Sequence, residues 1–313
     1  MQPSGVKTVA KNYLYEAFGL TLQSEYPIAQ LLPASDGAEV DVRICQADLS
    51  GYNIAWDHCR ILVDELIIAI TDVGTFRITE GKLVQVHPVQ ACSLSQLGVY
   101  IMGSCMGAVL HQRGLMPLHG SCVTDGTHAV LITGESGAGK STLAAEFLSR
   151  GWKLLTDDVC AVSDPEGAAM VQPSYPSQKL WQDSLDHYGR PESDIHSLYF
   201  SEEREKFGVD VRRYFHPGTI PLTMIVQLLP TEEPCSISQI NAFTAIEQLM
   251  QNTYRLFMIP REHQQRHFQR CATLAGKIPM MLLTRQNGVQ CADKLYTLVS
   301  ERLEGMSGTG CQA

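Results

Sequence analysis

A single stretch, residues 129–142, restricts the fold more than any other part of the chain. Its sequence is AVLITGESGAGKST. The first five residues are apolar or β-branched, which predicts a short buried strand. Residues 134–141 then match the phosphate-binding pattern G-x-x-x-x-G-K-[ST] at every position. The apolar run that follows ends at Gly151 and predicts a helix. Strand, glycine-rich loop and helix, in that order, are the context in which this pattern binds phosphate.

The residue types of this loop suit the phosphates of a nucleotide. Its glycines carry no Cβ that could block a phosphate, and they let the backbone N–H groups turn inward. The helix that begins near Lys140 adds unsatisfied N–H donors and the positive end of its dipole. Lys140 can reach the outer phosphates, and the Ser141 hydroxyl can bind the Mg²⁺ that a nucleotide carries. A glycine-rich turn that binds nothing is the alternative. The residues predicted to contact the nucleotide are Gly134, Glu135, Ser136, Gly137, Ala138, Gly139, Lys140, Ser141 and Thr142.

Composition excludes some classes of partner. The chain has 313 residues, 44% of them hydrophobic and 18% charged, which is typical of one large globular domain or two moderate ones. The formal net charge is −9, and no run of Lys or Arg occurs. An acidic chain of this kind is poorly suited to non-specific contact with nucleic acid or with an anionic membrane. We therefore expect neither as a partner.

The cysteines and the apolar stretches indicate the compartment. Ten cysteines occur singly, without a C-x-x-C pair, so zinc and thioredoxin-like chemistry lack support. Free thiols in that number suggest a reducing compartment. The first ten residues lack an apolar signal core, and the apolar stretches at 61–70 and 97–110 are too short to span a bilayer. We therefore expect a soluble, cytoplasmic protein.

Two domains are expected, with a boundary after residue 95. Residues 1–95 contain short β-like runs separated by turn signals, which predict a β-rich domain built as a meander of hairpins. A structural platform and a partner-binding role are equally open for it. Residues 96–313 form the second domain, which begins with a helix over 97–113 and a strand that ends near residue 123. The β-like runs of the first domain lie at 40–45, 60–63, 66–71, 75–79 and 83–87.

An acid pair follows the helix of the phosphate loop. Residues 152–162 form two apolar runs that predict strands, and Asp157 and Asp158 stand between them. Adjacent carboxylates at a strand end beside a phosphate loop can divide the work of phosphoryl transfer. One can hold Mg²⁺, while the other accepts the proton of the attacking hydroxyl. If the acid pair stood alone, an exposed Asp-Asp turn would be the simpler interpretation. Because an intact phosphate-loop pattern and helix precede it, a role in phosphoryl transfer is favoured.

The rest of the second domain carries weaker signals. Residues 174–181 predict an irregular connection into a short helix, and the charged run 201–206 predicts a solvated segment. The basic residues Lys206, Arg212, Arg213 and His216 are candidates for phosphate or acidic-peptide contact. A strand is expected at 224–229, then a helix over 241–250 whose apolar face continues through 252–257. A helix over 261–274, a strand over 278–284 and a helix over 292–303 complete the chain. His263 and His267 lack an acidic third ligand, so a surface pair is expected.

Three motifs together resemble the catalytic domain of HPr kinase/phosphorylase. They are LHGS at 118–121, GESGAGKST at 134–142 and RGWKLLTDD at 150–158. The resemblance is strong over residues 115–165 and loose over 95–285. It implies an α/β fold, a P-loop kinase domain of the type shared with phosphoenolpyruvate carboxykinase, beside the smaller N-terminal β-rich domain. It also implies transfer of a phosphoryl group from ATP, with Mg²⁺, to a serine hydroxyl on a protein.

The resemblance also implies roles for single residues. Asp157 and Asp158 resemble the acid pair of the family, one acting as the base and the other lying near the metal. We take Ser141 and Asp158 as the candidate metal ligands. His119 resembles the histidine that lies against this pair and tunes it. Without the resemblance, a core histidine at a strand end is the favoured interpretation of His119.

The chain departs from the bifunctional members of the family. Their signature near Glu-Ile-Arg-Gly-Leu-Gly is absent, and residues 175–184 stand in its place with the sequence YPSQKLWQDS. The chain is more similar to shorter HPr-kinase-like proteins, which resemble serine kinases that tailor a ribosomally made precursor peptide, as in lasso peptide pathways. By similarity to such relatives, Lys206 and Arg255 are expected to contact the substrate or its phosphate. The family also suggests a homo-oligomer.

The sequence therefore predicts an ATP- and Mg²⁺-dependent kinase that acts on a serine hydroxyl of a peptide or small protein. Three alternatives stay open. The first is a small-molecule kinase on the same scaffold, and the second is a nucleotide-dependent switch or ATPase without an acceptor. The third is a scaffold that has lost catalysis, which the intact Lys140, Ser141 and acid pair disfavour.

Overall fold

The computed structural model describes residues 12–163, 168–188, 192–200 and 205–308. The chain divides into two compact units, Met1–Gln112 and Arg113–Ala313. We expected a domain boundary after residue 95, whereas residues 96–112 group with the first unit. Each unit is described by itself below.

The first unit is built on one eight-stranded sheet with the order β3-β1-β2-β4-β8-β7-β6-β5. The strands β5 to β8 pair antiparallel with their neighbours in sequence, which confirms the expected meander. The pairs β2–β4 and β4–β8 are parallel. The opening hairpin β1–β2 was missed by the sequence prediction. The bounds are β1 Tyr13–Ala17, β2 Leu20–Ser24, β3 Leu32–Pro33, β4 Val42–Gln46, the 3-10 turn η1 Ser50–Tyr52, β5 Cys59–Ile61, β6 Glu65–Ile70, β7 Gly74–Thr79 and β8 Leu83–Pro88.

A continuous helical segment closes the first unit. It consists of α1 (Leu94–Tyr100), a π-helical turn η2 (Ile101–Cys105) and α2 (Met106–Gln112), which confirms the predicted helix. Over Leu94–Gln112 its length and its mean hydropathy of 1.2 are those of a candidate membrane span, yet 61% of that stretch is buried inside the fold. A core helix passes the same test of length and composition, so this segment is weak grounds for a membrane span.

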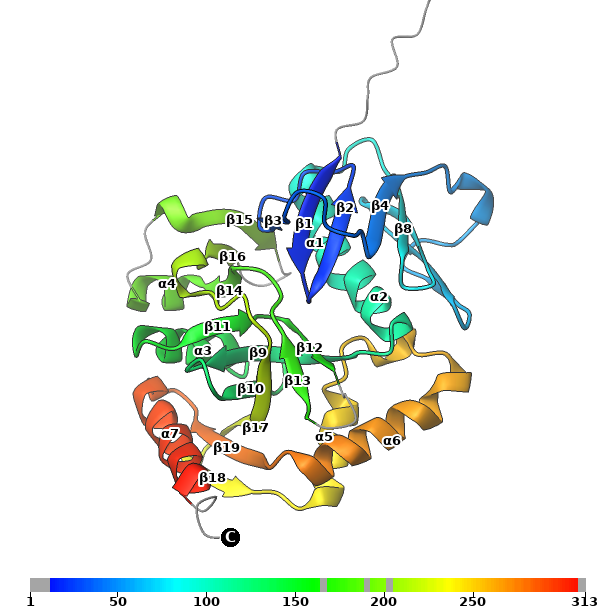
Figure 1. Ribbon diagram of the computed structural model, residues 1–313. Helices are drawn as coiled ribbons and strands as arrows, with labels where there is room; N and C mark the ends of the chain where they lie inside the picture. Colours follow the sequence, from blue (N-terminus) through cyan, green and yellow to red (C-terminus); the bar gives the residue numbers. More distant parts are fainter. Residues whose placement is uncertain (1–11, 164–167, 189–191, 201–204, 309–313) are drawn as a thin grey trace, which may run out of the picture. The chain divides into compact units, whose positions relative to one another are not determined.

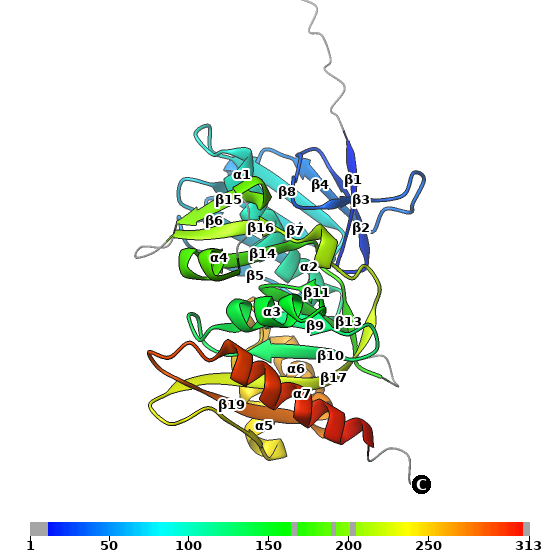
Figure 2. The ribbon, with the colours of Figure 1, turned by 90° about the vertical axis from the view of Figure 1, so that its left-hand side faces the viewer.

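The second unit has three layers. Its main sheet has the order β10-β9-β12-β13-β17-β19-β18, with β11 also paired to β9 and β10 also paired to β17. Figures 1 and 2 agree in placing α3 and α7 on one face of this sheet and α5 and α6 on the other. The bounds are β9 Met116–Thr124, β10 Ala129–Thr133, α3 Lys140–Ser149, β11 Lys153–Thr156, β12 Val159–Ser163, β13 Met170–Gln172, β17 Ile220–Thr231, β18 Ser236–Gln239, α5 Ala242–Gln251, η5 Leu256–Met258, α6 Arg261–Lys277, β19 Met280–Gln286 and α7 Ala292–Gly308.

A three-stranded sheet with the order β14-β16-β15 accompanies the main one. Its first strand leads directly into α4, whose C-terminal Tyr188 donates its hydroxyl to Thr142 O at 3.2 Å and to Glu146 Oε2 at 3.1 Å. This segment is therefore bonded to α3, the helix of the glycine-rich loop. The bounds are β14 Ser177–Trp181, α4 Gln182–Tyr188, η3 Glu192–Asp194, β15 Ile195–Phe200, β16 Glu205–Asp210 and η4 Arg212–Tyr214.

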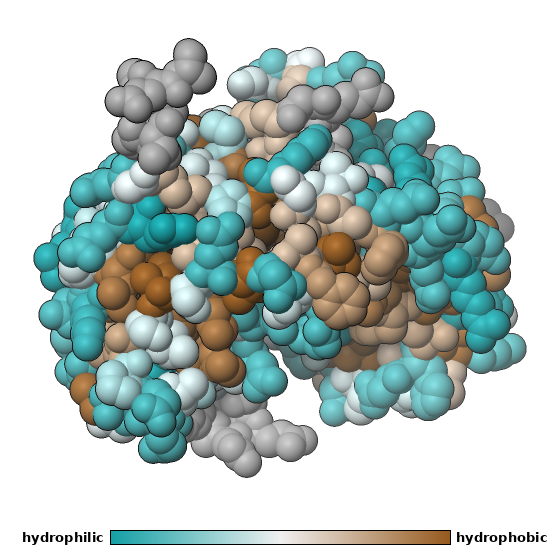
Figure 3. All heavy atoms as spheres, turned by 90° about the horizontal axis from the view of Figure 1, so that it is seen from below, coloured by the Kyte–Doolittle hydropathy of each residue, from teal (hydrophilic) through white to brown (hydrophobic). Residues whose placement is uncertain are grey.

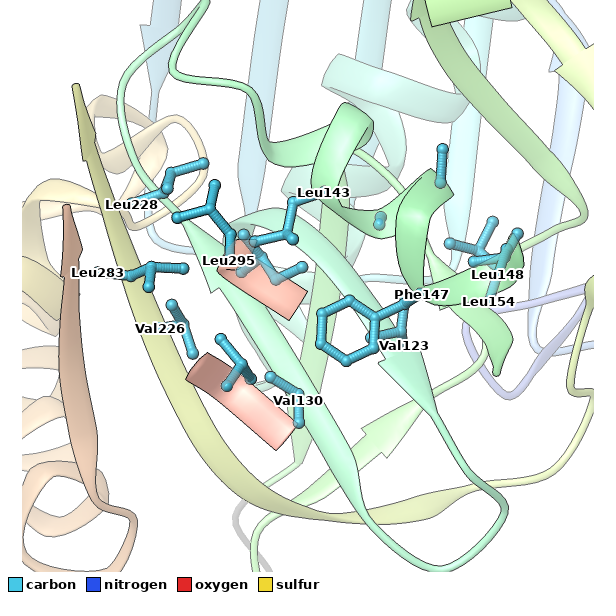
Figure 4. Packing of buried hydrophobic residues seen from close by; sticks show 14 of the residues in the cluster. Val123, Val130, Leu143, Phe147, Leu148, Leu154, Val226, Leu228, Leu283 and Leu295 are labelled. Carbon is cyan, nitrogen blue, oxygen red and sulfur yellow. The ribbon is translucent and has the colours of Figure 1, made fainter. Parts of the chain in front are cut away.

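Apolar side chains fill the space between the main sheet and each helical layer. Figure 4 shows Phe147 and Leu143 of α3 lying over Val130 of β10 and Val226 of β17, with Leu295 of α7 beside them. All five are buried to 2% exposure or less. A second cluster on the opposite face joins α5 and α6 to the same strands. Both faces of the central strands are covered, which explains why residues 129–132 are uninterrupted apolar residues.

Three parallel strands set the position of the glycine-rich loop. β10 pairs parallel to β17, and β17 pairs parallel to β19. Their carboxyl ends therefore lie at one edge of the sheet, and the glycine-rich loop leaves β10 at that edge. Ligands of open α/β sheets bind outside the carboxyl ends of the strands.

Three sequence predictions are wrong. Residues 177–181 were expected to be irregular but form β14, because pairing with β16 overrides the local Pro and Ser signals. The helix over 241–250 was expected to extend its apolar face through 252–257, but α5 ends at Gln251. His267 was expected at the surface but is 6% exposed, and its Nε2 lies 2.8 Å from the Thr253 hydroxyl. The charged run at 201–204 lies outside the described residues.

Gly120 of β9 has no room for a side chain. A Cβ at this position would lie 2.5 Å from Ile132 O and 2.9 Å from Leu131 Cδ1. We expect Gly120→Ala to lower the free energy of unfolding by about 1–3 kcal/mol, the usual cost of overpacking. Urea unfolding measures it. Gly276→Ala is the matched control, because Gly276 lies in α6 facing open space, and it should be neutral or stabilising. Equal stability of the two variants would contradict the close contact.

The surface mixes polar and apolar residues. The face shown in Figure 3 carries apolar patches interrupted by hydrophilic side chains. In the second unit the large exposed apolar side chains include Phe243, Phe257 and Phe268. Scattered apolar side chains are normal on a folded surface, so these three alone assign no partner.

Candidate functional site

The glycine-rich loop leads directly into a helix through two glycines in the left-handed region. Gly137 and Gly139 have φ of 82° and 106°, which favour glycine, and α3 begins directly afterwards at Lys140. Lys140 is 9% exposed, and its ammonium group donates to Gly134 O at 2.8 Å and Glu135 O at 3.0 Å. The backbone carbonyls of the loop thus hold the ammonium group beside the amides that start the helix. This arrangement keeps positive charge at the mouth of the loop.

Asn252, just beyond α5, joins the loop to the strand β9. Its Oδ1 accepts from Gly134 N at 3.3 Å, and its backbone oxygen accepts from His119 N at 2.7 Å. Its Nδ2 donates to Gln227 Oε1 at 2.8 Å. Asn252 is 7% exposed, so these bonds are shielded from water. One residue, through its side chain and its backbone, therefore fixes the first residue of the loop relative to His119.

The strand β9 lies between the loop strand and the acid pair. Gly120 pairs with Thr133, the residue before the loop, and His119 pairs with Val159, the residue after the acid pair. Side chains two apart on a strand point to the same face. His119 and Ser121 accordingly both line the cavity that the loop also lines.

Asp157 accepts hydrogen bonds from three directions. The Ser121 hydroxyl donates to its Oδ1, and so does the Ser141 hydroxyl at 3.1 Å. The backbone N–H of Lys179 donates to its Oδ2 at 2.7 Å. Asp157 is 3% exposed. A buried carboxylate needs such partners, and these bonds hold Asp157 directly against Ser141 of the glycine-rich loop.

Asp158 faces a different set of groups. Its Oδ2 accepts from Lys179 Nζ at 2.7 Å, and its Oδ1 lies 3.5 Å from His119 Nδ1. Its φ of 77° places a non-glycine residue in the left-handed region, which is unfavourable for a residue with a side chain. Such conformations persist only where the surrounding structure enforces them, and they cluster at functional sites. Lys179 thus contacts both acids, Asp157 through its backbone and Asp158 through its side chain.

The hydrogen bonds of His119 fix its tautomer. Nδ1 lies 3.0 Å from the backbone oxygen of Asp158. A carbonyl oxygen only accepts, so Nδ1 carries a proton and Nε2 is the acceptor of the neutral ring. Burial lowers the pKa of His119 below its ordinary value of 6.5, and the nearby Asp158 carboxylate opposes that change. Burial therefore favours the neutral form of the ring.

The His119 pKa can be measured by NMR titration of the nucleotide-free protein. The expected midpoint lies below 6.5, because burial disfavours the imidazolium form. Asp158→Asn should lower the midpoint further, because it removes a carboxylate that favours that form. Asp125→Asn is the control, since Asp125 bonds to His128 instead. A midpoint at or above 6.5 in the unmodified protein would contradict the dominance of burial.

The loop, the acid pair and His119 line one cavity of about 780 Å³. Further walls come from β14, which contributes Lys179 and Trp181, from α4, and from the segment between β19 and α7. The Arg285 side chain stands at the end of β19 in this wall. The volume falls within the range of small-molecule and cofactor sites.

Several predicted site residues lie on this cavity and others do not. Ser136, Gly137, Gly139, Lys140, Ser141, Thr142, His119, Asp157 and Asp158 line it. Gly134, Glu135 and Ala138 belong to the loop without lining the cavity. Arg255 does not line it either; its guanidinium lies 5.6 Å above the Tyr254 ring, and its φ is 47°. The backbone of Lys206 pairs with Trp181 in β16, and its side chain lies outside what the structure describes.

The residues of the site that were not predicted from the sequence include Ser121, Lys179 and Arg285. Ser121 could have been found, because the two-residue period of a strand places it on the same face as His119. Lys179 was hidden in a segment expected to be irregular. Arg285 had no sequence signal, since only the pairing of β19 with β17 brings it to the loop.

The oxygen donors near the loop fit a magnesium ion. Mg²⁺ is usually bound through one or two carboxylates together with waters and substrate phosphates. The Ser141 hydroxyl and the Asp157 carboxylate lie 3.1 Å apart, and both are hard oxygen ligands. Within the described ranges no group of three or more His, Cys, Asp and Glu side chains could hold a metal by itself. The donor set therefore suits a cation that arrives with a nucleotide.

Fold and site together define a P-loop α/β domain. Residues 114–184 match the family model of the HPr Serine kinase C-terminal domain. The chain is therefore HPr-kinase-like over the segment that carries the histidine, the loop and the acid pair, as the sequence motifs predicted.

Curated relatives match a part of the chain. An HPr kinase/phosphorylase of Clostridium beijerinckii is 38% identical over 82 residues, 26% of this chain and 26% of that protein. One from Clostridium botulinum is 46% identical over the same shares. The chain thus matches about a quarter of the length of these relatives. The Hpr(Ser) kinase/phosphatase structure from Coxiella burnetii aligns over 62% of this chain and 93% of its own, at 15% identity and a TM-score of 0.35.

Proposed function

We propose that this protein is an ATP- and Mg²⁺-dependent kinase that transfers the γ-phosphoryl group to a serine hydroxyl of a peptide or small protein. One observation carries the proposal. The acid pair and the phosphate loop line the same cavity, and Asp157 is bonded to Ser141 of the loop. A nucleotide bound by the loop then has its outer phosphate near two carboxylates and a neutral histidine. The family relationship of residues 114–184 supports the reaction class.

The loop binds the triphosphate. Its amides and the N-terminus of α3 donate to phosphate oxygens. The Lys140 ammonium leaves the carbonyls of Gly134 and Glu135 and binds the outer phosphates. Positive charge and aligned donors stabilise the transition state, since phosphoryl transfer leaves little covalent work for the protein.

Ser141 and Asp157 hold the magnesium ion in this proposal. We expected Asp158 beside Ser141, but the Ser141 hydroxyl donates to Asp157. The bound ion supplies neutralisation of the charge that develops on the phosphate oxygens. Ser121 and the backbone N–H of Lys179 orient the Asp157 carboxylate toward Ser141.

Asp158 is the base that accepts the proton of the serine hydroxyl. The Ser141 hydroxyl bonds to Asp157, whereas Asp158 Oδ1 lies 3.5 Å from His119 Nδ1. His119 donates from Nδ1 to the Asp158 backbone and keeps that residue in its left-handed conformation. Lys179 holds the carboxylate in place through its side chain until the acceptor binds. In this arrangement, Asp158 is a positioned general base and the loop aligns the phosphate that the serine attacks.

The acceptor is proposed to be a ribosomally made precursor peptide of the lasso type. The absence of the Glu-Ile-Arg-Gly-Leu-Gly signature and the segment YPSQKLWQDS in its place support a substrate other than that of the bifunctional relatives. Lys206 and Arg255 are proposed substrate contacts. Arg255 Nε is buried without a hydrogen-bond partner among the described residues, which leaves a donor for a substrate group. A metabolite kinase and an ATPase switch are the rivals.

Incubation with γ-labelled ATP and Mg²⁺ tests the function. Serine-containing precursor peptides should gain one phosphoryl group by mass spectrometry, whereas their Ser→Ala versions and a panel of small metabolites should not. Labelled metabolites would favour the small-molecule kinase. Release of inorganic phosphate with every acceptor unmodified would favour the ATPase switch.

A cytoplasmic location and assembly as a homo-oligomer are part of the same proposal. All nine cysteines within the described residues have free thiols, which supports a reducing compartment. Sedimentation of the purified protein measures its oligomeric state.

A further inference from the structure

Arg285 is a cation in the cavity wall. Within the described residues, no carboxylate oxygen lies within 4.0 Å of its guanidinium nitrogens. Its Nη2 donates weakly to Asn287 Oδ1 at 3.4 Å, and its Nε is buried without a hydrogen-bond partner. A guanidinium carries five donors, and a buried donor left without an acceptor costs free energy. Arg285 therefore has unmet capacity to bind an anion.

The topology brings this cation to the phosphate loop. Arg285 is the sixth residue of β19, the strand parallel to β17, which is in turn parallel to β10. It thus stands at the same carboxyl edge of the sheet as the loop. A Cβ placed on Gly139 would lie 3.7 Å from Arg285 Cδ and 3.8 Å from its Nε. The side chain therefore packs directly against the last glycine before Lys140, on the wall of the cavity that the loop lines.

We propose that Arg285 binds the polyphosphate of the nucleotide from the wall opposite the acid pair, as a second cation beside Lys140. The proposal rests on nucleotide binding by the loop. A guanidinium matches two phosphate oxygens at once, while the Lys140 ammonium acts as a point charge. The two side chains then divide the triphosphate between them, and phosphate oxygens satisfy the donor that is unpaired in the nucleotide-free protein.

Calorimetric titration with ATP measures this contact without any acceptor. Arg285→Met keeps the length of the side chain and removes its charge, and it should weaken ATP binding at least about tenfold, the scale of a lost charge-assisted hydrogen bond. Arg285→Lys should restore part of the affinity. Arg302→Met is the matched control, because Arg302 lies on α7 and bonds to Gln239 away from the cavity. It should bind ATP as the unmodified protein does.

Inorganic tripolyphosphate serves as the second probe, because it lacks the nucleoside. It should compete with ATP on the unmodified protein and compete more weakly on Arg285→Met. Thermal unfolding without nucleotide separates binding from folding: Arg285→Met should be at least as stable as the unmodified protein, since the variant loses an unpaired charge. A less stable variant with ATP affinity within twofold of normal would make Arg285 a structural residue and overturn the proposal.

The outcome also separates this inference from the proposed function. If the unmodified protein binds ATP and Lys140→Ala loses binding while Arg285→Met retains it, the loop is a nucleotide site and the role of Arg285 is wrong. A protein that binds neither ATP nor tripolyphosphate overturns both proposals.

Discussion

Lys140→Ala is expected to abolish phosphoryl transfer while the fold is retained. Its ammonium group is held by two loop carbonyls at 2.8 and 3.0 Å, so it is already positioned at the loop before a nucleotide arrives. Its removal takes away the charge that opposes the growing negative charge on the transferred phosphoryl group. Loss of one such preorganised group costs about 10²–10³-fold in turnover, and loss of affinity for ATP adds to it. Steady-state transfer of label from ATP to the acceptor peptide measures the change.

The expected loss of activity follows from the position of Lys140 in the loop, so removing a lysine elsewhere should not cause it. Lys277→Ala is the matched control, because Lys277 ends α6 and does not line the cavity. That variant should keep full activity. Circular dichroism and thermal unfolding of Lys140→Ala should show a folded protein. Full transfer by Lys140→Ala would refute the assignment of the loop as the phosphate site.

Asp158→Asn is expected to lower kcat by at least about 100-fold with little change in ATP affinity. The amide keeps the shape of the side chain but cannot accept the serine proton, and a positioned base contributes about 10²–10⁴-fold. Asp157→Asn should lower turnover on a similar scale, with weaker binding of Mg²⁺·ATP, because Asp157 bonds to Ser141. The two variants are distinguished by the Mg²⁺ concentration needed for half-maximal activity.

A third acid provides the control for this pair. Asp125 accepts from His128 in the turn before β10 and does not line the cavity. Asp125→Asn should therefore transfer phosphate normally. If Asp158→Asn does so as well, the base lies elsewhere; if only Asp157→Asn is slow and its Mg²⁺ requirement is unchanged, the roles of the two acids are exchanged.

The sequence specified the local part of the site. The loop pattern, its strand and its helix are contiguous in the chain, so their chemistry could be predicted from residue types alone. The acid pair follows after one helix and one strand, α3 and β11, and its position beside the loop is confirmed by the bond between Asp157 and Ser141. The expected meander of β5 to β8 is likewise local, because each strand pairs with its neighbour in sequence.

The rest of the site depends on contacts between distant residues. Lys179 reaches the acid pair because β14 pairs with β16, a pairing that no local propensity encodes. Asn252 was expected to continue the apolar face of a helix. Instead, its backbone oxygen accepts from His119 N of β9, and its side-chain Oδ1 accepts from Gly134 N of the loop. Arg285 arrives through the parallel pairing of β19. Pairings between strands that are far apart in the chain cannot be predicted from a single sequence by local patterns.

The strand β9 couples the loop and the acid pair through a single run of backbone. His119 and Ser121 share one face of that run, and Gly120 between them meets the backbone of β10. Insertion of a single amino acid between His119 and Ser121 would interchange the inward and outward sides of the strand beyond that point. The hydroxyl of Ser121 would then be lost from Asp157 even though every motif stayed intact. Homologues that vary in length elsewhere are therefore expected to keep the spacing of this tripeptide fixed.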